Sequence, residues 1–326
     1  MTAGPRLGAQ TPFAIEVLDE LRERGYRPRA WTRFLAHAWR QSRITAAAHP
    51  DLAASWARTT VTLVGGTAAA LAYEARLGQM ETSRRALPLT ALCLAYQQFD
   101  VYAHLGLHAP AAGAPLRREI GAPTTLTLLR GATAALLWGH LAAGRPVSPG
   151  YLGAALGLAG ATDIADGALA RRRAQATRLG AYLDAEADLS FGLATALTLA
   201  AHQRLPRWLV AVMLARWAGP FALACASYFG AAHPVALAGT RAGKAAGLAQ
   251  TAVVVAALLP TRRNNAPGRW RGPLHLASAA ILVAAPITQV LRVLGPLTRP
   301  ACHPSSRRPC AAPDRPAWRL PPPPPL

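Results

Sequence analysis

The sequence predicts an all-α protein whose helices cross a membrane several times. The chain has 326 residues, of which 52% are hydrophobic and 15% charged, whereas about 25% are charged in ordinary soluble domains. Broken apolar runs of about 20 residues, the length that a membrane helix needs, recur along it. Most arginines lie between these runs, where a charge avoids the cost of the bilayer interior.

Eight such runs predict eight helices, and glycine and proline mark most of the joints between them. Two runs come first, and six follow at close intervals after residue 124. The second run also contains Gln97, Gln98, Asp100 and His104. The expected ranges are 59–76, 87–107, 124–143, 149–170, 180–201, 207–230, 243–260 and 273–294.

Residues 1–58 precede the apolar runs and differ from them. Their first 25 residues carry acids, from Glu16 onward, where a signal peptide would carry a basic n-region and an apolar core, so no cleaved targeting segment is expected. A basic and aromatic stretch follows, which predicts an amphipathic helix lying on the membrane surface. The alternative is a soluble cap packed on the helices. The residues at helical spacing are Trp31, Phe34, Leu35, Ala38 and Trp39, beside Arg29, Arg33, Arg40 and Arg43.

The formal net charge of +20 suits contact with an anionic lipid leaflet. Nucleic-acid binding would also suit it, but the apolar runs argue against that class, and we expect no nucleic-acid partner. The basic N-terminal segment, with the arginines of residues 27–43, predicts a cytoplasmic N-terminus, and eight crossings then place the loop 171–179 in the cytoplasm too. The arginine-rich loop 262–272 falls on the other side, so either the rule fails there or one crossing is misassigned.

The cysteines and the end of the chain predict no further site. Cys93, Cys225, Cys302 and Cys310 show no C-x-x-C spacing, and we expect structural or incidental roles for them. From residue 297 the tail is rich in proline, which predicts disorder or a polyproline conformation.

Four aspartates stand out between two of the apolar runs. Asp163 and Asp166 are three residues apart, and Asp184 and Asp188 are four apart, so each pair shares one helix face. A helical hairpin would bring the pairs together, and carboxylates so close repel unless cations lie between them. Oxygen ligands suit Mg²⁺ or Mn²⁺, which predicts a site for two ions that acts on phosphates. The alternative is a solvated loop in which the acids pair with the arginines of residues 171–178.

The same stretch follows the pattern D-x2-D-G-x2-A-R-x8-G-x3-D-x3-D. This pattern agrees at every fixed position with the signature of the CDP-alcohol phosphotransferases, and the chain resembles that family. Members transfer a phosphatidyl or other phosphoalcohol group from a CDP-linked donor to an alcohol and release CMP. The resemblance implies a core of six transmembrane helices whose site faces the cytoplasm. The fixed positions are Asp163, Asp166, Gly167, Ala170, Arg171, Gly180, Asp184 and Asp188.

The resemblance also implies a role for each residue of the signature. Asp163, Asp166, Asp184 and Asp188 match the metal ligands, and Asp188 also matches the general base. The positions that line the cytidine pocket are matched by Gly167, Ala170 and Gly180, and the arginine near the diphosphate by Arg171. Glu186 is the one acid that the signature does not require, and we expect it to be exposed on the opposite helix face, because two residues along a helix correspond to about 200°.

Two further segments resemble family motifs. The first is P-x-x-L-T-x-x-R, which is matched by Pro123, Leu126, Thr127 and Arg130. The match implies that Arg130 faces the site. The alternative is that Arg130 extends to the membrane interface. Gly243, Lys244 and Gln250 match G-K-x-x-T-x-x-Q of phosphatidylglycerophosphate synthase-like members, with Gly247 in place of the threonine. Arg130 and Lys244 are thus candidate contacts for a phosphate or the acceptor.

These observations divide the chain into four regions and predict its activity. The regions are an interfacial segment 1–58, two added membrane helices in 59–110, a six-helix catalytic domain 111–296 and the tail 297–326. We expect phosphatidyl transfer from CDP-diacylglycerol to a small alcohol, for example glycerol 3-phosphate, at a multi-pass protein of the plasma membrane. The alternatives are transfer from a soluble CDP-alcohol to a lipid, and a divalent-cation transporter. Relatives are commonly dimers, which implies a homodimer.

Overall fold

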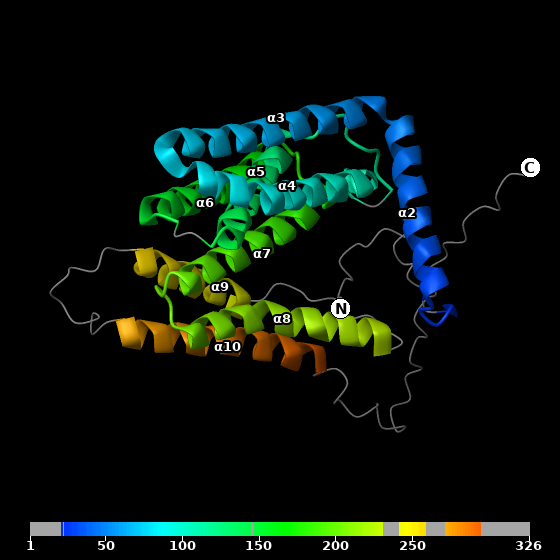
Figure 1. Cartoon of the computed structure of the whole chain (residues 1–326). Helices are drawn as coiled ribbons and strands as arrows, with labels where there is room; N and C mark the ends of the chain where they lie inside the picture. Colours follow the sequence, from blue (N-terminus) through cyan, green and yellow to red (C-terminus); the bar gives the residue numbers. More distant parts are fainter. Residues whose placement is uncertain are drawn as a thin grey trace, which may run out of the picture.

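The computed structural model describes residues 21, 23–111, 113–144, 147–230, 241–258 and 271–294. These residues form helices and contain no strand, which confirms the all-α prediction (Figure 1). The helices are α2 (Pro28–Ala48), α3 (Pro50–Glu74), η1 (Ala75–Gln79), α4 (Met80–Ala103), η2 (Leu105–Leu107), α5 (Ala122–Ala142), α6 (Pro149–Arg172), α7 (Arg178–Ala201), α8 (Arg207–Gly230), α9 (Arg241–Leu258) and α10 (Arg271–Leu294).

Each of the eight predicted helices is present, but the first two begin earlier than expected. The first begins at Pro50 instead of residue 59, and the second begins at Met80 instead of residue 87 and ends at Ala103. The prediction followed apolar residues, whereas the polar first turns of α3 and α4 are helical as well. Proline at the start of α3 favours that position because it has no N–H to leave unpaired.

Among the described residues, no helix combines the length and the apolar character that a bilayer crossing requires. Three predictions concern residues outside the described part of the chain. They are those for residues 1–20, for residues 262–270 of the arginine-rich loop, and for the tail with Cys302 and Cys310. The side chain of Cys225 also lies outside it, whereas Cys93 is a free, half-buried thiol.

The helices stack in three layers (Figure 1). The hairpin of α3 and α4 forms the first layer, and its reversal contains Gly78 with φ 86°, a conformation that favours glycine. Helices α5, α6 and α7 form the middle, and α8, α9 and α10 lie on the other side. Helix α2 stands steeply against α3 at one edge and is held there by Trp39, whose ring stacks on Phe99 of α4 at 5.7 Å.

Helix α4 approaches α5 very closely. A Cβ atom placed on Gly139 would lie 2.0 Å from Oγ1 of Thr90 and 2.5 Å from the carbonyl oxygen of Ala86, and one placed on Gly131 would lie 2.0 Å from Nε2 of Gln97. The two glycines are eight residues apart and share one face of α5, which allows the helices to meet backbone to backbone. The first layer is therefore built directly onto the helix that begins the predicted catalytic domain.

Candidate metal and nucleotide site

Helices α6 and α7 form the hairpin that the aspartate spacing predicts. The turn between them is short, and Ala174 takes φ 49° there. Thr177 caps α7, because its Oγ1 accepts a hydrogen bond from the backbone N–H of Gly180 at 3.0 Å. The last turns of α6 therefore lie beside the first turns of α7, where the two aspartate pairs are found.

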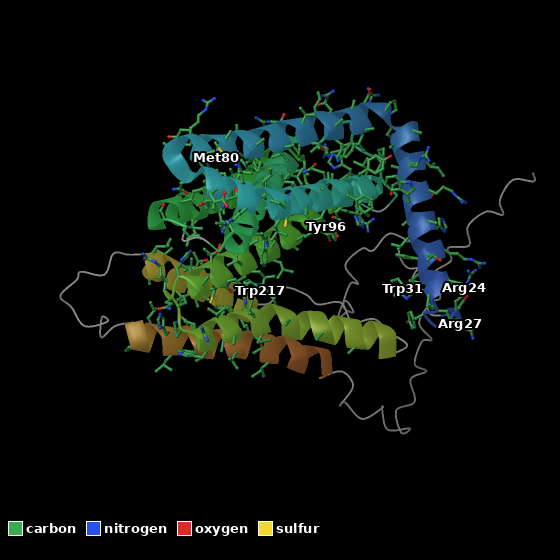
Figure 2. The ribbon with its side chains drawn as sticks, viewed as in Figure 1. Arg24, Arg27, Trp31, Met80, Tyr96 and Trp217 are labelled. Atoms are coloured by element: carbon green, nitrogen blue, oxygen red, sulfur yellow. The ribbon has the colours of Figure 1, made fainter. Side chains whose placement is uncertain are left out.

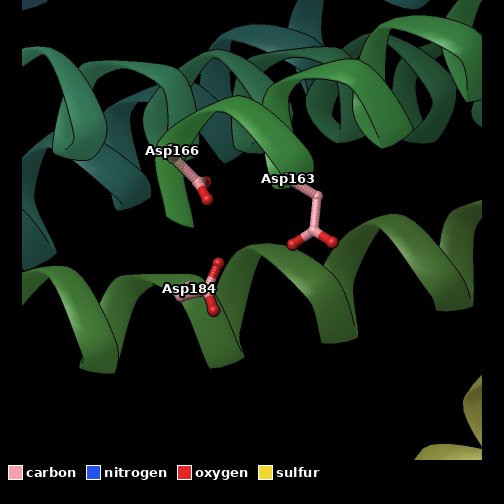
Figure 3. A group of neighbouring side chains, drawn as sticks. All are labelled: Asp163, Asp166 and Asp184. Carbon is pink, nitrogen blue, oxygen red and sulfur yellow. The ribbon is translucent and has the colours of Figure 1, made fainter. Parts of the chain in front are cut away.

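Three of the four aspartates meet in one group. Carboxylate oxygens of Asp163, Asp166 and Asp184 lie within 4.8 Å of one another (Figure 3). Such an all-oxygen group fits a hard divalent cation such as Mg²⁺ or Mn²⁺. Asp188 lies outside this group, one helical turn beyond Asp184 on the same face of α7.

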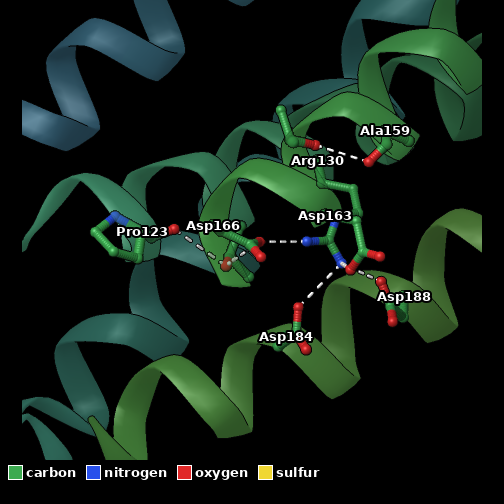
Figure 4. A network of polar contacts seen from close by, with 9 residues as sticks. Pro123, Arg130, Ala159, Asp163, Asp166, Asp184 and Asp188 are labelled. Carbon is green, nitrogen blue, oxygen red and sulfur yellow. Dashed lines mark hydrogen bonds and ion pairs between the residues drawn. The ribbon is translucent and has the colours of Figure 1, made fainter. Parts of the chain in front are cut away.

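Arg130 lies at the centre of all four aspartates (Figure 4). Its guanidinium is 3.3 Å from Asp163 and 3.0 Å from Asp184, and it also contacts Asp166 and Asp188. The residue is only 1% exposed, so it does not extend to a membrane interface. In this arrangement the arginine supplies the positive charge that converging carboxylates require.

Thr127 is a further contact of the cluster that the sequence analysis did not assign a role. Its Oγ1 donates a hydrogen bond to Oδ2 of Asp166 at 3.0 Å. Thr127 and Arg130 are three residues apart on α5, so both reach α6 from one helix face. The threonine of the L-T-x-x-R motif thus orients a carboxylate that could hold a metal ion.

A pocket of about 180 Å³ adjoins the aspartates. Gly167, Ala170 and Gly180 all line it, together with Asp166 and Asp184. Its other lining residues are Pro123, Thr124, Thr127, Gln175, Ala176, Thr177 and Ala181.

Arg171 and Gln175 flank this pocket. A Cβ atom on Gly167 would lie 3.2 Å from Nη1 of Arg171, so the arginine extends along the glycine. Oε1 of Gln175 is buried and has no hydrogen-bond partner among the described residues. Gln175 could not be identified from the sequence, because a single glutamine in a polar loop carries no distinguishing pattern.

The second family motif lies on α9 (Arg241–Leu258), where Nε2 of Gln250 would be 3.6 Å from a Cβ atom placed on Gly192 of α7. Lys244 is exposed near the start of α9, and Gln250 is buried and accepts a hydrogen bond from Nη1 of Arg216 at 2.8 Å. Nη2 of Arg216 donates to the carbonyl oxygen of Gly243 at 3.2 Å. The motif therefore joins α9 to α8 through Arg216, which the sequence analysis did not single out. A contact of Lys244 with phosphate stays a prediction.

Comparisons with known proteins agree with the signature. Residues 121–290, just over half of the chain, match the family model of the CDP-alcohol phosphatidyltransferases, and the protein belongs to this family. A cardiolipin synthase (CMP-forming) of Streptomyces coelicolor is 44% identical over 73 residues, which cover 22% of this chain and 34% of that protein. The match thus spans about a third of the relative. No solved structure matches the chain.

Proposed function

We propose that the protein transfers a phosphatidyl group from CDP-diacylglycerol to an alcohol and releases CMP. The observation that carries this proposal is that two features lie next to each other between α6 and α7. One is the oxygen group of Asp163, Asp166 and Asp184, and the other is the adjoining pocket lined by the small residues of the family signature. A diphosphate bound next to metal ions is the substrate that such a pair of sites suits.

Each side chain then has a task in the reaction. The four aspartates would hold two divalent ions, which neutralise the diphosphate and stabilise the leaving CMP. Asp188, whose side chain is 57% exposed, accepts the proton of the attacking hydroxyl. The hydroxyl oxygen forms a bond to the phosphatidyl phosphorus, and the bond from that phosphorus to the CMP oxygen breaks. Arg171 pairs with the diphosphate beside Gly167.

The acceptor can be a water-soluble alcohol or a lipid. Glycerol 3-phosphate is the candidate from the sequence. The identity to a CMP-forming cardiolipin synthase favours a second candidate, because a cardiolipin product requires the acceptor hydroxyl of phosphatidylglycerol. Transfer from a soluble CDP-alcohol to a lipid remains the alternative donor scheme.

We infer a multi-pass protein of the plasma membrane with its site facing the cytoplasm, acting as a homodimer. Its composition and family support this location. Trp31 and Leu35 are exposed on α2, and Figure 2 places Trp31 near Arg27 at the end of α2 remote from α3. Such a helix suits an anionic lipid surface.

A panel assay tests the proposed reaction. The purified full chain is incubated with CDP-diacylglycerol, Mg²⁺ and one alcohol at a time, including glycerol 3-phosphate and phosphatidylglycerol, and CMP and the mass of the lipid product are measured. We expect CMP release that depends on one acceptor and stops with a chelator. Absence of CMP with every acceptor, combined with uptake of Mn²⁺ into vesicles that hold the protein, would favour the transporter instead.

A further inference from the structure

A second polar cluster lies on the side of α7 that faces α4. Its centre is Asp100, which is only 7% exposed although it carries a carboxylate. Oδ1 of Asp100 accepts a hydrogen bond from the hydroxyl of Tyr182 at 3.2 Å and lies 3.1 Å from Nδ1 of His104. The His104 and Tyr182 rings are 4.8 Å apart. Burying a carboxylate is costly unless its partners compensate, so this cluster calls for an explanation.

The cluster is connected to the metal site through the geometry of α7. Tyr182 and Glu186 precede and follow Asp184 by two residues, which places them on the opposite side of the helix. The Glu186 side chain is half-buried beside Asp100 and Tyr96, and Figure 2 shows Tyr96 on α4. The expectation that Glu186 is exposed is therefore wrong, because the side chain lines a pocket of about 390 Å³ together with Tyr96 and Gln97 of α4.

Helix α4 also contacts α5, the helix that contributes Arg130 to the site. Nε2 of Gln97 donates to the carbonyl oxygen of Leu128 on α5 at 3.0 Å and lies against Gly131. Gly131 directly follows Arg130, the residue at the centre of the four aspartates. One turn of α4 thus carries Gln97, which fixes α5, and Asp100, which fixes α7.

We propose that Asp100 is a positioning residue for the metal site, a role that rests on the proposed function. By holding Tyr182 it fixes the rotation of α7 about its own axis, and so the direction in which Asp184 and Asp188 point. Metal-binding groups have to be held within about 0.5 Å and 10–20° of their working geometry. Loss of a side chain that orients a ligand typically weakens metal binding by about 10- to 100-fold.

The test measures Mn²⁺ binding to the full chain by electron paramagnetic resonance, without substrate, beside the thermal midpoint. Tyr182→Phe removes one hydroxyl and leaves the ring, so the fold is retained. We expect Tyr182→Phe and Asp100→Ala to raise the apparent Kd for Mn²⁺ about tenfold or more. Asp100→Asn keeps an oxygen acceptor for Tyr182 and should recover most of the affinity.

The matched control is Glu74→Gln. Glu74 of α3 forms a buried pair with Nε2 of His140 on α5 at 2.9 Å and also interacts with Tyr151 on α6, so its loss weakens the attachment of the first layer to α5 and α6 without touching α7. We expect a lower thermal midpoint and an unchanged Kd for Mn²⁺. The positioning role is overturned if Tyr182→Phe binds Mn²⁺ like the wild type, or if Glu74→Gln weakens binding equally. A wild-type chain that binds no Mn²⁺ would instead overturn the metal site itself.

Discussion

Nη1 of Arg130 donates a hydrogen bond to Oδ1 of Asp184 at 3.0 Å, across the interface between α5 and α7. The second terminal nitrogen of the guanidinium, Nη2, donates a hydrogen bond to Oδ2 of Asp166 on α6. One buried side chain thus links the three helices of the middle layer. The divalent cations proposed for this site would bind the same carboxylates as Arg130, so the two sources of positive charge would be thermodynamically coupled.

Arg130→Gln should destabilise the protein and make its stability depend more strongly on Mg²⁺. Removing the guanidinium leaves the negative charges of the aspartates uncompensated, which should lower the free energy of unfolding by about 3 kcal/mol. This is the low end of the range for broken buried ion pairs, because three of the four carboxylates are partly exposed. Added Mg²⁺ should recover more stability in the variant than in the wild type. Thermal unfolding with chelator and with Mg²⁺ measures this difference.

Arg204→Gln is the control for that measurement. Nη1 of Arg204 donates to the carbonyl oxygen of Ala257 at 3.2 Å, away from any described carboxylate. Its loss should shift the thermal midpoint equally with and without Mg²⁺. An Arg130→Gln variant that responds to Mg²⁺ no more than this control would contradict the coupling.

Asp188→Asn should slow CMP release strongly while affecting metal affinity less than Asp184→Asn does. Loss of a general base slows a reaction by about 10²- to 10⁴-fold. Asp184 belongs to the group of three carboxylates that could hold one ion, and Asp188 does not. CMP release and Mn²⁺ binding by the two isosteric variants measure the contrast. Equal loss of Mn²⁺ binding in both would show that Asp188 acts mainly as a ligand, and full activity of Asp188→Asn would remove it as the base.

The sequence predicted the helices and the aspartate group because both depend on spacing along one chain. Residues three or four apart share a helix face wherever the helix lies, so Asp163 and Asp166 could be paired without a structure. The partners of Glu186 and Gln97 could not be found this way. Their contacts join α4 to α7 and α5, and a single sequence gives no signal for which helix faces meet across such distances.

Gly180→Leu should weaken nucleotide binding without affecting the metal ions. A Cβ atom at Gly180 already lies 3.2 Å from Oγ1 of Thr177 and 3.5 Å from Oγ1 of Thr124, and a larger side chain would fill the pocket. We expect the Kd for CDP to rise at least tenfold, or about 1.4 kcal/mol. The increase in thermal midpoint caused by CDP reports the affinity.

Gly160→Leu is the matched control for the pocket. It lies on α6, and a Cβ atom there meets no described atom within 4 Å apart from its chain neighbours and the nearby backbone of its own helix. CDP should stabilise this variant as it stabilises the wild type. If both leucine variants lose the response to CDP, the pocket beside Gly180 is not the nucleotide site.

Gly131→Ala and Gly139→Ala should both destabilise the packing of α4 on α5, by about 1–3 kcal/mol as for other overpacked interfaces. Only the Gly131→Ala variant should regain stability when the side chain that its Cβ meets is shortened by a second substitution. The Cβ at Gly131 meets the end of the Gln97 side chain, so Gln97→Ala makes room for it. The Cβ at Gly139 meets Oγ1 of Thr90 and also the carbonyl oxygen of Ala86 at 2.5 Å, and this oxygen remains when Thr90 becomes alanine. Chemical denaturation of the two single and two double variants measures the coupling. Equal rescue at both positions would mean that the helices separate readily, and that α4 does not hold α5 as closely as the structure describes.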